Sequence, residues 1–241
     1  MSKRYEHTGA IHNFNAPLEV VPWLMHRVRP GSVLDVGCGT GTWLKVFSDN
    51  RVMDYLGIDS DEVQADSLTI PPDHFMAKDL RHQIDLQRKY DLVISLEVAE
   101  HLDESCADQF VNTLTSHAGV ILFSAAVPGQ GGQHHVNEQW PDYWEKKFNR
   151  NGFYLHDEIR AHFWNNEKVD WWYRQNMFLV TTEPTTSRPL SLVHPELLRR
   201  SMTDLKQYAD SVATGRQGLW VSLKIALNAV GFKLRSLLGI R

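Results

Sequence analysis

The segment from Ser32 to Thr42 reads Ser-Val-Leu-Asp-Val-Gly-Cys-Gly-Thr-Gly-Thr and constrains the fold more than any other part of the chain. A short apolar run that ends at an acidic residue and then at alternating glycines predicts a buried strand that turns sharply into a helix. Glycines at such a turn adopt positive φ and let a ligand approach the backbone. A second predicted strand, 55–58, ends at Asp59, where an acid is suited to bind ribose hydroxyls. Together these features predict a nucleoside-bearing cofactor.

The glycine spacing separates two classes of cofactor. A dinucleotide fingerprint requires Gly-x-Gly-x-x-Gly or Ala over a helix N-terminus. Counted from Gly37 the third small position is Thr42, and counted from Gly39 it is Leu44, so neither reading fits. Asp35 stands just before the turn, where it would repel a pyrophosphate and attract a cation. S-adenosylmethionine carries a sulfonium and an ammonium and no phosphate, so it suits this loop.

Four segments, 33–41, 55–61, 77–80 and 90–102, resemble the motifs of class I S-adenosylmethionine-dependent methyltransferases, in order and at the proper spacing. The resemblance covers roughly residues 13–182. Alternating strands and helices already indicate an α/β, Rossmann-like, doubly wound fold with a mainly parallel sheet. The resemblance adds a seven-stranded sheet with one antiparallel strand, expected over 176–182, preceded by a strand over 154–159.

The same resemblance assigns the cofactor-binding residues. Asp59 is expected to accept from both ribose hydroxyls, because the two oxygens of a carboxylate match a vicinal diol. Asp79 is expected to accept from the adenine amino group, and Glu97 is expected at the carboxyl edge of the sheet. For Asp79 and Glu97 the alternative is an acid at a helix N-terminus or in a solvated loop. The full set is Asp35, Gly37, Cys38, Gly39, Gly41, Asp59, Asp79, Leu80 and Glu97.

The segment 128–144 follows the fifth predicted strand and is expected to contact the methyl acceptor. It contains a glycine-rich stretch and then paired histidines, and O-methylation needs a base because a protonated hydroxyl is a poor nucleophile. His135 is the first candidate and His134 the second, with Asn137, Glu138 and Gln139 orienting the imidazole or binding acceptor hydroxyls. The alternative for His135 is a loop histidine that only packs. His101 is a rival base, although it is expected to open a helix beside the cofactor.

A third group of residues, 171–176, contains Tyr173 and Arg174, which are candidates to stack on a sugar or to bind a phosphate. A core or lid role is the alternative. The Pro-Gly-Gln-Gly-Gly loop, His-x-Asn-Glu-Gln and Tyr-Arg-Gln-Asn resemble methyltransferases of bacterial surface-polysaccharide and glycan biosynthesis. The expected reaction is therefore methylation of a sugar or glycan hydroxyl. A small-molecule or quinone-type O- or N-methyltransferase and a non-catalytic cofactor-binding partner stay open as rivals.

Composition limits the partners. The net charge of -4 and the pI near 6.3 argue against a nucleic-acid partner. No Asn/Asp-Pro-Pro-Tyr-type target-base loop follows the fourth strand. Two cysteines and no secretory leader predict a cytoplasmic protein. The sequence has neither Cys-x-x-Cys nor His-Glu-x-x-His, so no metal is predicted.

Two domains are expected, a methyltransferase domain over 1–182 and a linker with a C-terminal helical extension over 183–241. Helices are predicted over 195–209 and over Trp220 to Leu238. From Arg216 to Arg241 there are five basic residues and no acid. Such a basic amphipathic segment fits peripheral contact with an anionic inner membrane face, or packing on its own domain or a second subunit. The sequence leaves these possibilities open.

Overall fold

The structure is a computed structural model that describes residues 13–237, with side chains described as far as residue 230. It divides into two compact units, and the division falls between His194 and Pro195. The connecting residues before that point belong to the first unit. Arg160 Nη2 donates to the Leu190 carbonyl at 2.9 Å, and the His194 N–H donates to Gln175 Oε1 at 2.7 Å. The division therefore lies twelve residues beyond the domain boundary expected from the sequence.

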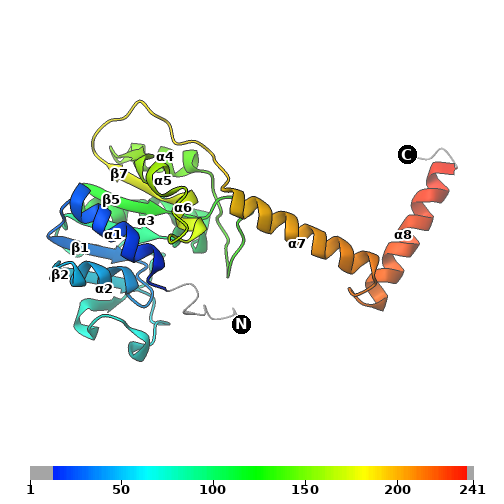
Figure 1. Cartoon of the computed structure of the whole chain (residues 1–241), viewed down its shortest axis with the longest axis horizontal. Coiled ribbons are helices and arrows are strands. Elements are labelled where there is room, and N and C mark those ends of the chain that lie inside the picture. The colour runs from blue at the N-terminus through cyan, green and yellow to red at the C-terminus, as the bar shows by residue number, and fades with distance from the viewer. Residues whose placement is uncertain (1–12, 238–241) are drawn as a thin grey trace. The chain divides into compact units, whose positions relative to one another are not determined.

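The first unit is built on one seven-stranded sheet with the order β3-β2-β1-β4-β5-β7-β6 (Figure 1). β1, β2, β3, β4 and β5 are parallel, and β7 pairs antiparallel with both β5 and β6. This confirms the predicted α/β, Rossmann-like fold. The strands are β1 (Ser32–Val36), β2 (Asp54–Asp59), β3 (Phe75–Ala77), β4 (Leu92–Leu96), β5 (Val120–Ser124), β6 (Tyr154–His156) and β7 (Phe178–Thr181).

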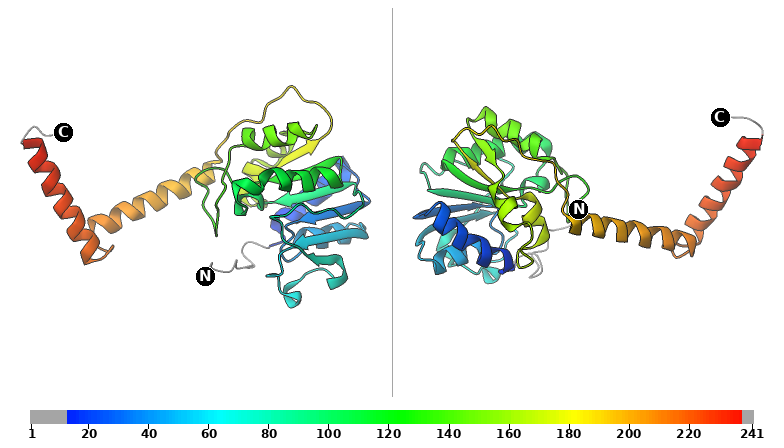
Figure 2. Two further views of the ribbon diagram at one scale, coloured as in Figure 1. Left: turned by 180° about the vertical axis from the view of Figure 1, so that it is seen from behind. Right: turned by 45° about the horizontal axis from the view of Figure 1, so that its top comes forward.

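Helices cover both faces of the sheet, as the doubly wound prediction requires. One face carries α1 (Asn15–Arg27), α2 (Thr42–Asp49), α5 (Glu158–Phe163) and α6 (Trp171–Asn176), which lie in front of the sheet in Figure 1. The other face carries α3 (Ala107–His117) and α4 (Pro141–Arg150), in front of the sheet when it is viewed from behind (Figure 2, left). Each layer buries its own apolar cluster. Strands that are buried on both faces read as continuous apolar runs, and β4 is such a strand.

The sequence interpretation was wrong beyond β6. A strand was expected over 154–159, but β6 ends at His156 and α5 begins at Glu158. Asp157 and Arg160 form an ion pair three residues apart, which a helical turn allows and an extended strand does not. Arg160 is only 2% exposed, so this pair holds the turn inside the unit. Asn176 was expected to begin a strand but is the last residue of α6, and β7 begins two residues later than expected.

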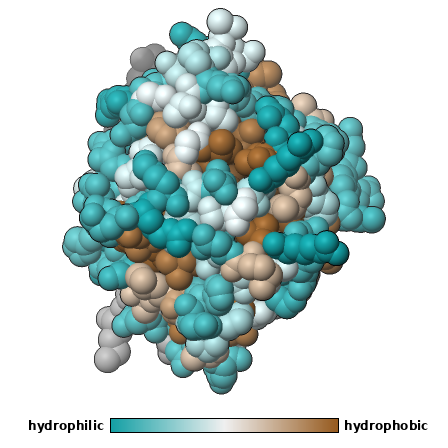
Figure 3. Space-filling model, turned by 90° about the vertical axis from the view of Figure 1, so that its left-hand side faces the viewer, coloured by the Kyte–Doolittle hydropathy of each residue, from teal (hydrophilic) through white to brown (hydrophobic). Residues whose placement is uncertain are grey.

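The second unit contains α7 (Pro195–Ala213) and α8 (Leu219–Leu237), close to the two predicted helices. Leu238 and the side chains beyond residue 230 lie outside the described part. α8 exposes large apolar side chains, with Trp220 81% and Leu227 64% exposed. By contrast, the face of the molecule seen in Figure 3 is mainly hydrophilic, with small separate apolar patches. Among the described helices none is long and apolar enough to cross a membrane. Membrane contact and self-association of this segment both stay predictions.

Phe47 offers a test of the core that holds the cofactor loop. Its side chain is fully buried on α2 among residues of α1 and the sheet. Phe47→Ala is expected to lower the free energy of unfolding by about 3–5 kcal/mol, because it removes apolar contacts and leaves a cavity. Urea denaturation followed by circular dichroism measures this. Met53→Ala is the control, since Met53 is 71% exposed and its replacement should stay within about 0.5 kcal/mol; equal effects of the two substitutions would contradict the described core.

Candidate active site

The loop between β1 and α2 is held by backbone contacts with the end of β2. The N–H groups of Gly37 and Cys38 donate to the Ile58 carbonyl at 2.7 and 3.1 Å. Gly37 has φ 89°, and a Cβ there would lie 2.3 Å from Val98 Cγ2, so only glycine lets the loop pack on the segment after β4. Gly41 caps α2 in the left-handed region. The predicted strand–turn–helix is therefore present. Its glycines have backbone conformations that would be strained in any other residue.

Asp59 and Asp35 place two carboxyl groups beside this loop. The Asp59 carboxylate accepts from the N–H of Gly39 at 2.7 Å and from the N–H of Ser60 at 2.6 Å. Asp35 is 3% exposed on β1, and burial together with the nearby Asp59 raises its pKa well above the usual value. Two acids beside a glycine loop favour a cationic ligand, because a positive charge would stabilise their ionised forms.

Asp79 and Leu80 lie on the segment after β3, next to Asp59. The Lys78 N–H donates to the Asp59 carbonyl at 2.7 Å, which brings this segment to the cofactor loop. Asp79 binds the Arg81 guanidinium through both of its oxygens at 2.9 and 2.8 Å, and this partner lowers the pKa of Asp79 to about 2. Asp79 is therefore an ionised acceptor. The adenine amino group, if it binds Asp79 as predicted, would donate to a carboxylate that also accepts from Arg81.

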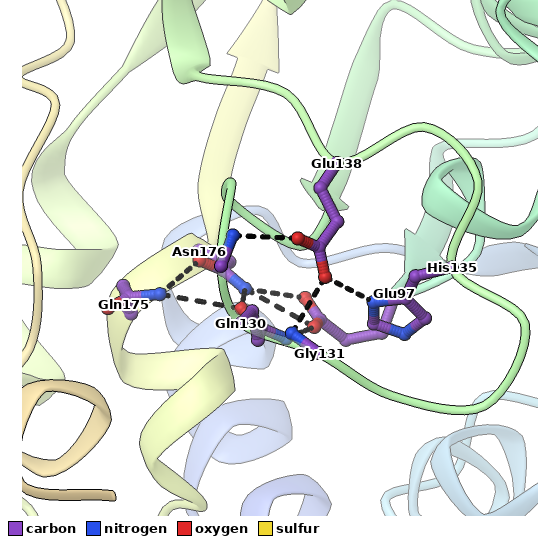
Figure 4. A network of polar contacts seen from close by, with 8 residues as sticks. Glu97, Gln130, Gly131, His135, Glu138, Gln175 and Asn176 are labelled. Atoms are coloured by element: carbon purple, nitrogen blue, oxygen red, sulfur yellow. Dashed lines mark hydrogen bonds and ion pairs between the residues drawn. The ribbon is translucent and has the colours of Figure 1, made fainter. Parts of the chain in front are cut away.

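Glu97 follows β4 and is the centre of a network of amide side chains (Figure 4). Its backbone has φ 55°, and its carboxylate accepts from Gln130 Nε2 at 2.7 Å and from Asn176 Nδ2 at 3.1 Å. Asn176 Nδ2 also donates to Gln130 Oε1 at 2.8 Å. Burial raises the pKa of Glu97 despite these donors. The network ties the end of β4 to the loop after β5 and to α6.

His135 and Glu138 lie on the loop after β5, beside this network (Figure 4). Glu138 accepts from the N–H groups of Gly129 and Gly131, each at 2.7 Å, and contacts His135 Nδ1 at 2.8 Å. A carboxylate can only accept, so the proton of the last contact belongs to Nδ1 and leaves Nε2 as an acceptor. The side chain of His135 is 12% exposed. Glu138 therefore holds the glycine-rich loop in shape and orients the imidazole.

Glu100 and His101 lie next to His135, on the 3₁₀ turn η3 (Ala99–His101). His101 ends this turn rather than opening a helix, which corrects the sequence interpretation. Its ring packs edge-on against His135 with centroids 4.8 Å apart. Glu100 is fully buried, and its carbonyl accepts from the N–H groups of Val136 and Asn137 at 2.9 and 3.0 Å. This turn is therefore bonded to the loop that carries His135.

Other predicted residues stand apart from this group. His134 is exposed with φ 56°, and Tyr173 is buried edge-on against Trp43 with ring centroids 5.4 Å apart. Burial and the nearby Glu97 raise the pKa of Tyr173. Arg174 donates to the Trp164 carbonyl at 3.4 Å, and Gln139 donates to Asn137 Oδ1 at 2.9 Å. Within the described residues none of these contacts reaches His135, so their substrate roles stay predictions.

Sequence reasoning missed Gln130, Asn176 and Glu100 as site residues. Gln130 and Asn176 occur in the two motifs quoted for the glycan resemblance, but amides carry no strong chemical signal of their own. Glu100 had a usable signal, because Glu-x-x-Glu-His places two acids and a histidine within five residues after a buried strand. What the sequence does not reveal is that both acids turn inward.

Comparison with known proteins decides the family. A family model described as a methyltransferase domain matches residues 12–182, which is more than half of the chain. The chain belongs to this methyltransferase family. The family is S-adenosylmethionine-dependent, so this methyltransferase takes its methyl group from that cofactor. The loop described above fits a cationic cofactor, because the carboxyl groups of Asp35 and Asp59 lie beside it.

Solved structures share the methyltransferase fold at low identity. Magnesium protoporphyrin IX methyltransferase from Synechocystis, with S-adenosylhomocysteine bound, is 21% identical, with a TM-score of 0.56 over 72% of this chain and 84% of that one. The sugar N-methyltransferase KedS8 from Streptoalloteichus is 19% identical, with a TM-score of 0.55 over 73% and 90%. The amino pentose methyltransferase CalS10 from Micromonospora echinaspora is 15% identical, with a TM-score of 0.54 over 76% and 99%. No curated protein matches the chain.

Asp59 provides a test of the cofactor site. Asp59→Ala removes a charged acceptor, and bonds to charged groups contribute roughly 1.5–3 kcal/mol. The affinity of the methyltransferase for S-adenosylmethionine should therefore fall by about 10- to 100-fold in calorimetric titration. Asp61→Ala is the matched control, because Asp61 is an exposed acid two residues further on. A loss of affinity in Asp61→Ala equal to that in Asp59→Ala would refute the assignment.

His101 provides a test of the electrostatics. Burial, reinforced by His135, lowers its pKa from 6.5 to about 4. As the pH falls, the unfolded state therefore takes up this proton before the folded state does. The stability that neutral His101 contributes is full above pH 6.5 and is lost as the pH falls toward about 4. Ring nitrogen chemical shifts measured by NMR between pH 4 and 7, assigned with His101→Gln, should show His101 neutral at pH 6. A midpoint above pH 6 would contradict the described burial.

Proposed function

We propose that this methyltransferase methylates a hydroxyl group of a sugar or glycan, with His135 as the general base. The observation that carries the proposal is the His135–Glu138 contact of 2.8 Å at the carboxyl edge of the sheet. That edge is where ligands bind in open α/β sheets. Transfer to a hydroxyl requires removal of a proton, and this pair supplies an oriented base at the right edge.

The orientation of His135 supports a base rather than a packing role. Glu138 holds the proton on Nδ1 and so keeps the lone pair on Nε2, as the carboxylate does in other histidine-based sites. Gly132 leaves the ring edge uncovered, since a Cβ at that position would lie 2.2 Å from Nε2. The imidazole therefore has one nitrogen fixed by the protein and one available to an acceptor.

The chemistry balances with these groups. Bound S-adenosylmethionine supplies a methyl group on a sulfonium, so that a carbon–oxygen bond forms as the carbon–sulfur bond breaks and sulfur keeps the electron pair. The acceptor proton passes to Nε2 of His135, and Glu138 stabilises the resulting imidazolium. Asp35 and Asp59 balance the charge of the donor site. Holding the oxygen in line with the methyl group contributes most of the rate.

Two features support a sugar as the acceptor class. Gln130, Asn137 and Gln139 are amides on the loop that also carries His135, and amides offer both donors and acceptors to hydroxyl groups. The amino pentose and sugar N-methyltransferases share the fold, which supports a sugar by fold analogy alone. A base is needed for a hydroxyl, whereas a neutral amine already carries a free lone pair. The histidine therefore favours oxygen as the methylated atom.

His135 gives the decisive variant. His135→Ala should keep the affinity for S-adenosylmethionine and lose turnover by about 10²- to 10⁴-fold, the usual range for a general base. His134→Ala separates the first candidate from the second, and His26→Ala is the control because His26 lies exposed on α1. Turnover and cofactor affinity are measured on the same preparations. Unchanged turnover in His135→Ala would rule out the base.

The acceptor class is tested with S-adenosylmethionine that is labelled on its methyl group. The purified chain is incubated with fractionated extract of its own organism, and the fraction that gains label is identified. Label in nucleotide-sugar or polysaccharide fractions is the expected result. Label confined to organic-soluble material would replace the sugar with an apolar acceptor.

A further inference from the structure

Three side chains beside the proposed base come together as a set of metal ligands. Glu100, His101 and His135 each offer one ligand atom, and these atoms all lie within 4.8 Å of one another. Two of the residues come from the turn after β4, and the third comes from the loop after β5. The Glu100 carbonyl bonds to Val136 and Asn137 hold the loop against the turn. The cluster is therefore set by backbone contacts and not by flexible surface side chains.

Glu100 supplies an independent observation. Its side chain is 0% exposed, and neither carboxylate oxygen makes a hydrogen bond of normal geometry. A buried polar group without hydrogen-bond partners is costly to keep in a folded protein. Such a group is expected where a ligand completes its coordination.

The charges around the cluster point the same way. Glu97, Glu100 and Glu138 surround His135 with three carboxyl groups. Among the residues that the structure describes, no lysine or arginine forms an ion pair with Glu97 or Glu100. Imidazole binds a metal through a ring nitrogen in its neutral form. The cluster therefore brings carboxyl oxygens and two imidazoles together at one place, and no basic side chain is paired with Glu97 or Glu100 in the part of the chain that the structure describes.

We propose that Glu100, His101 and His135 bind a divalent first-row transition ion. Imidazole nitrogens favour such ions over Ca²⁺ and Mg²⁺, and two histidines with one carboxylate leave coordination positions open for a ligand oxygen. Glu138 then acts as the carboxylate that orients a metal-bound histidine through its other ring nitrogen. The sequence reasoning predicted no metal because it searched for short ligand spacings. His135 follows His101 by 34 residues and Glu100 by 35 along the chain.

The site deepens the proposed function and rests on it for its role in catalysis. The proposed metal site shares His135 with the proposed base, and an ion bound there would lower the pKa of a hydroxyl that binds to it. His135 cannot hold a proton and an ion on the same nitrogen. In the metal-bound form the ion therefore activates the hydroxyl and His135 is its ligand, whereas in the metal-free form His135 is the base. An acceptor with two neighbouring oxygens, such as a vicinal diol of a sugar, fits both arrangements.

The experiment uses the full chain after treatment with a chelator. Mn²⁺ is titrated in and its free signal is followed by electron paramagnetic resonance, and Zn²⁺ and Mg²⁺ are compared by calorimetry. We expect one Mn²⁺ per chain. Glu100→Gln and His101→Gln should each weaken its binding on the order of 100-fold, the upper end of the loss typical even of an outer-shell partner. Glu104→Gln and His26→Gln are controls on exposed residues of the same types. Absence of Mn²⁺ binding at 1 mM ion, on the order of the weakest specific sites, would overturn the proposal.

A second measurement guards against variants that fail to fold. Glu100→Gln keeps the shape of the side chain and removes a buried acid, so the metal-free variant should melt no lower than the metal-free wild type. Added Mn²⁺ should raise the melting temperature of the wild type and of Glu104→Gln but not of Glu100→Gln. An equal Mn²⁺ shift in all three proteins would place the ion elsewhere and overturn the proposal.

The two proposals fail separately. Binding of Mn²⁺ that depends on Glu100 and His101, in a chain that labels no hydroxyl acceptor, supports the metal site and rejects the proposed function. Label on a sugar without any Mn²⁺ binding supports the proposed function, with His135 as the base, and rejects the metal site. Turnover of the stripped enzyme that rises on adding the ion, and does so only with Glu100 intact, supports both.

Discussion

The Asp59 carboxylate, bonded to the N–H groups of Gly39 and Ser60, is the interaction on which the cofactor site depends. It joins the loop after β1 to the end of β2, in addition to the bonds that the N–H groups of Gly37 and Cys38 make to the Ile58 carbonyl. A charged acceptor on backbone donors gives a strong and directional bond. The loop is then fixed before any ligand arrives, and its glycines only need to allow the conformation that Asp59 imposes. The same carboxylate is the one expected to bind the ribose, so that holding the loop and binding the cofactor fall to one side chain.

The residues around His135 are held in place differently, by side chains that satisfy one another. Glu97, Gln130 and Asn176 satisfy one another within a half-buried network, and Glu138 satisfies the glycine loop. Networks of this kind gain from mutual polarisation in a low dielectric, and they lose heavily when one member is missing. Glu100 is the member left without compensation, one turn away from the network. The contrast between the satisfied and the unsatisfied glutamate is what separates a structural acid from a candidate ligand.

The parts of the chain that were predictable are those where one physical signal dominates. The β1 turn could be predicted from Gly37 and Gly41, because few residues other than glycine adopt those backbone conformations. The antiparallel strand near 178–181 came from the resemblance and was correct within two residues. The resemblance extended the preceding strand to Ile159, whereas the ion pair of Asp157 with Arg160 that favours a helix is weak as a sequence signal. Spatial clusters such as Glu100 with His135 depend on how two loops meet, and periodicity carries no information about that.

The position of β7 has a consequence for how the protein is made. β6 precedes β7 in the chain but pairs only with it, and β7 lies between β5 and β6. A ribosome-bound chain that has reached only residue 156 therefore presents β5 as an open edge, although its cofactor half is already encoded. Open apolar edges recruit strands from other chains. Glu97 meets Asn176 across 79 residues, so the bond between them forms only after the chain has been translated beyond residue 176. During synthesis this enzyme therefore passes through a stage in which the cofactor loop is already encoded while β5 is still an open edge that other chains can join.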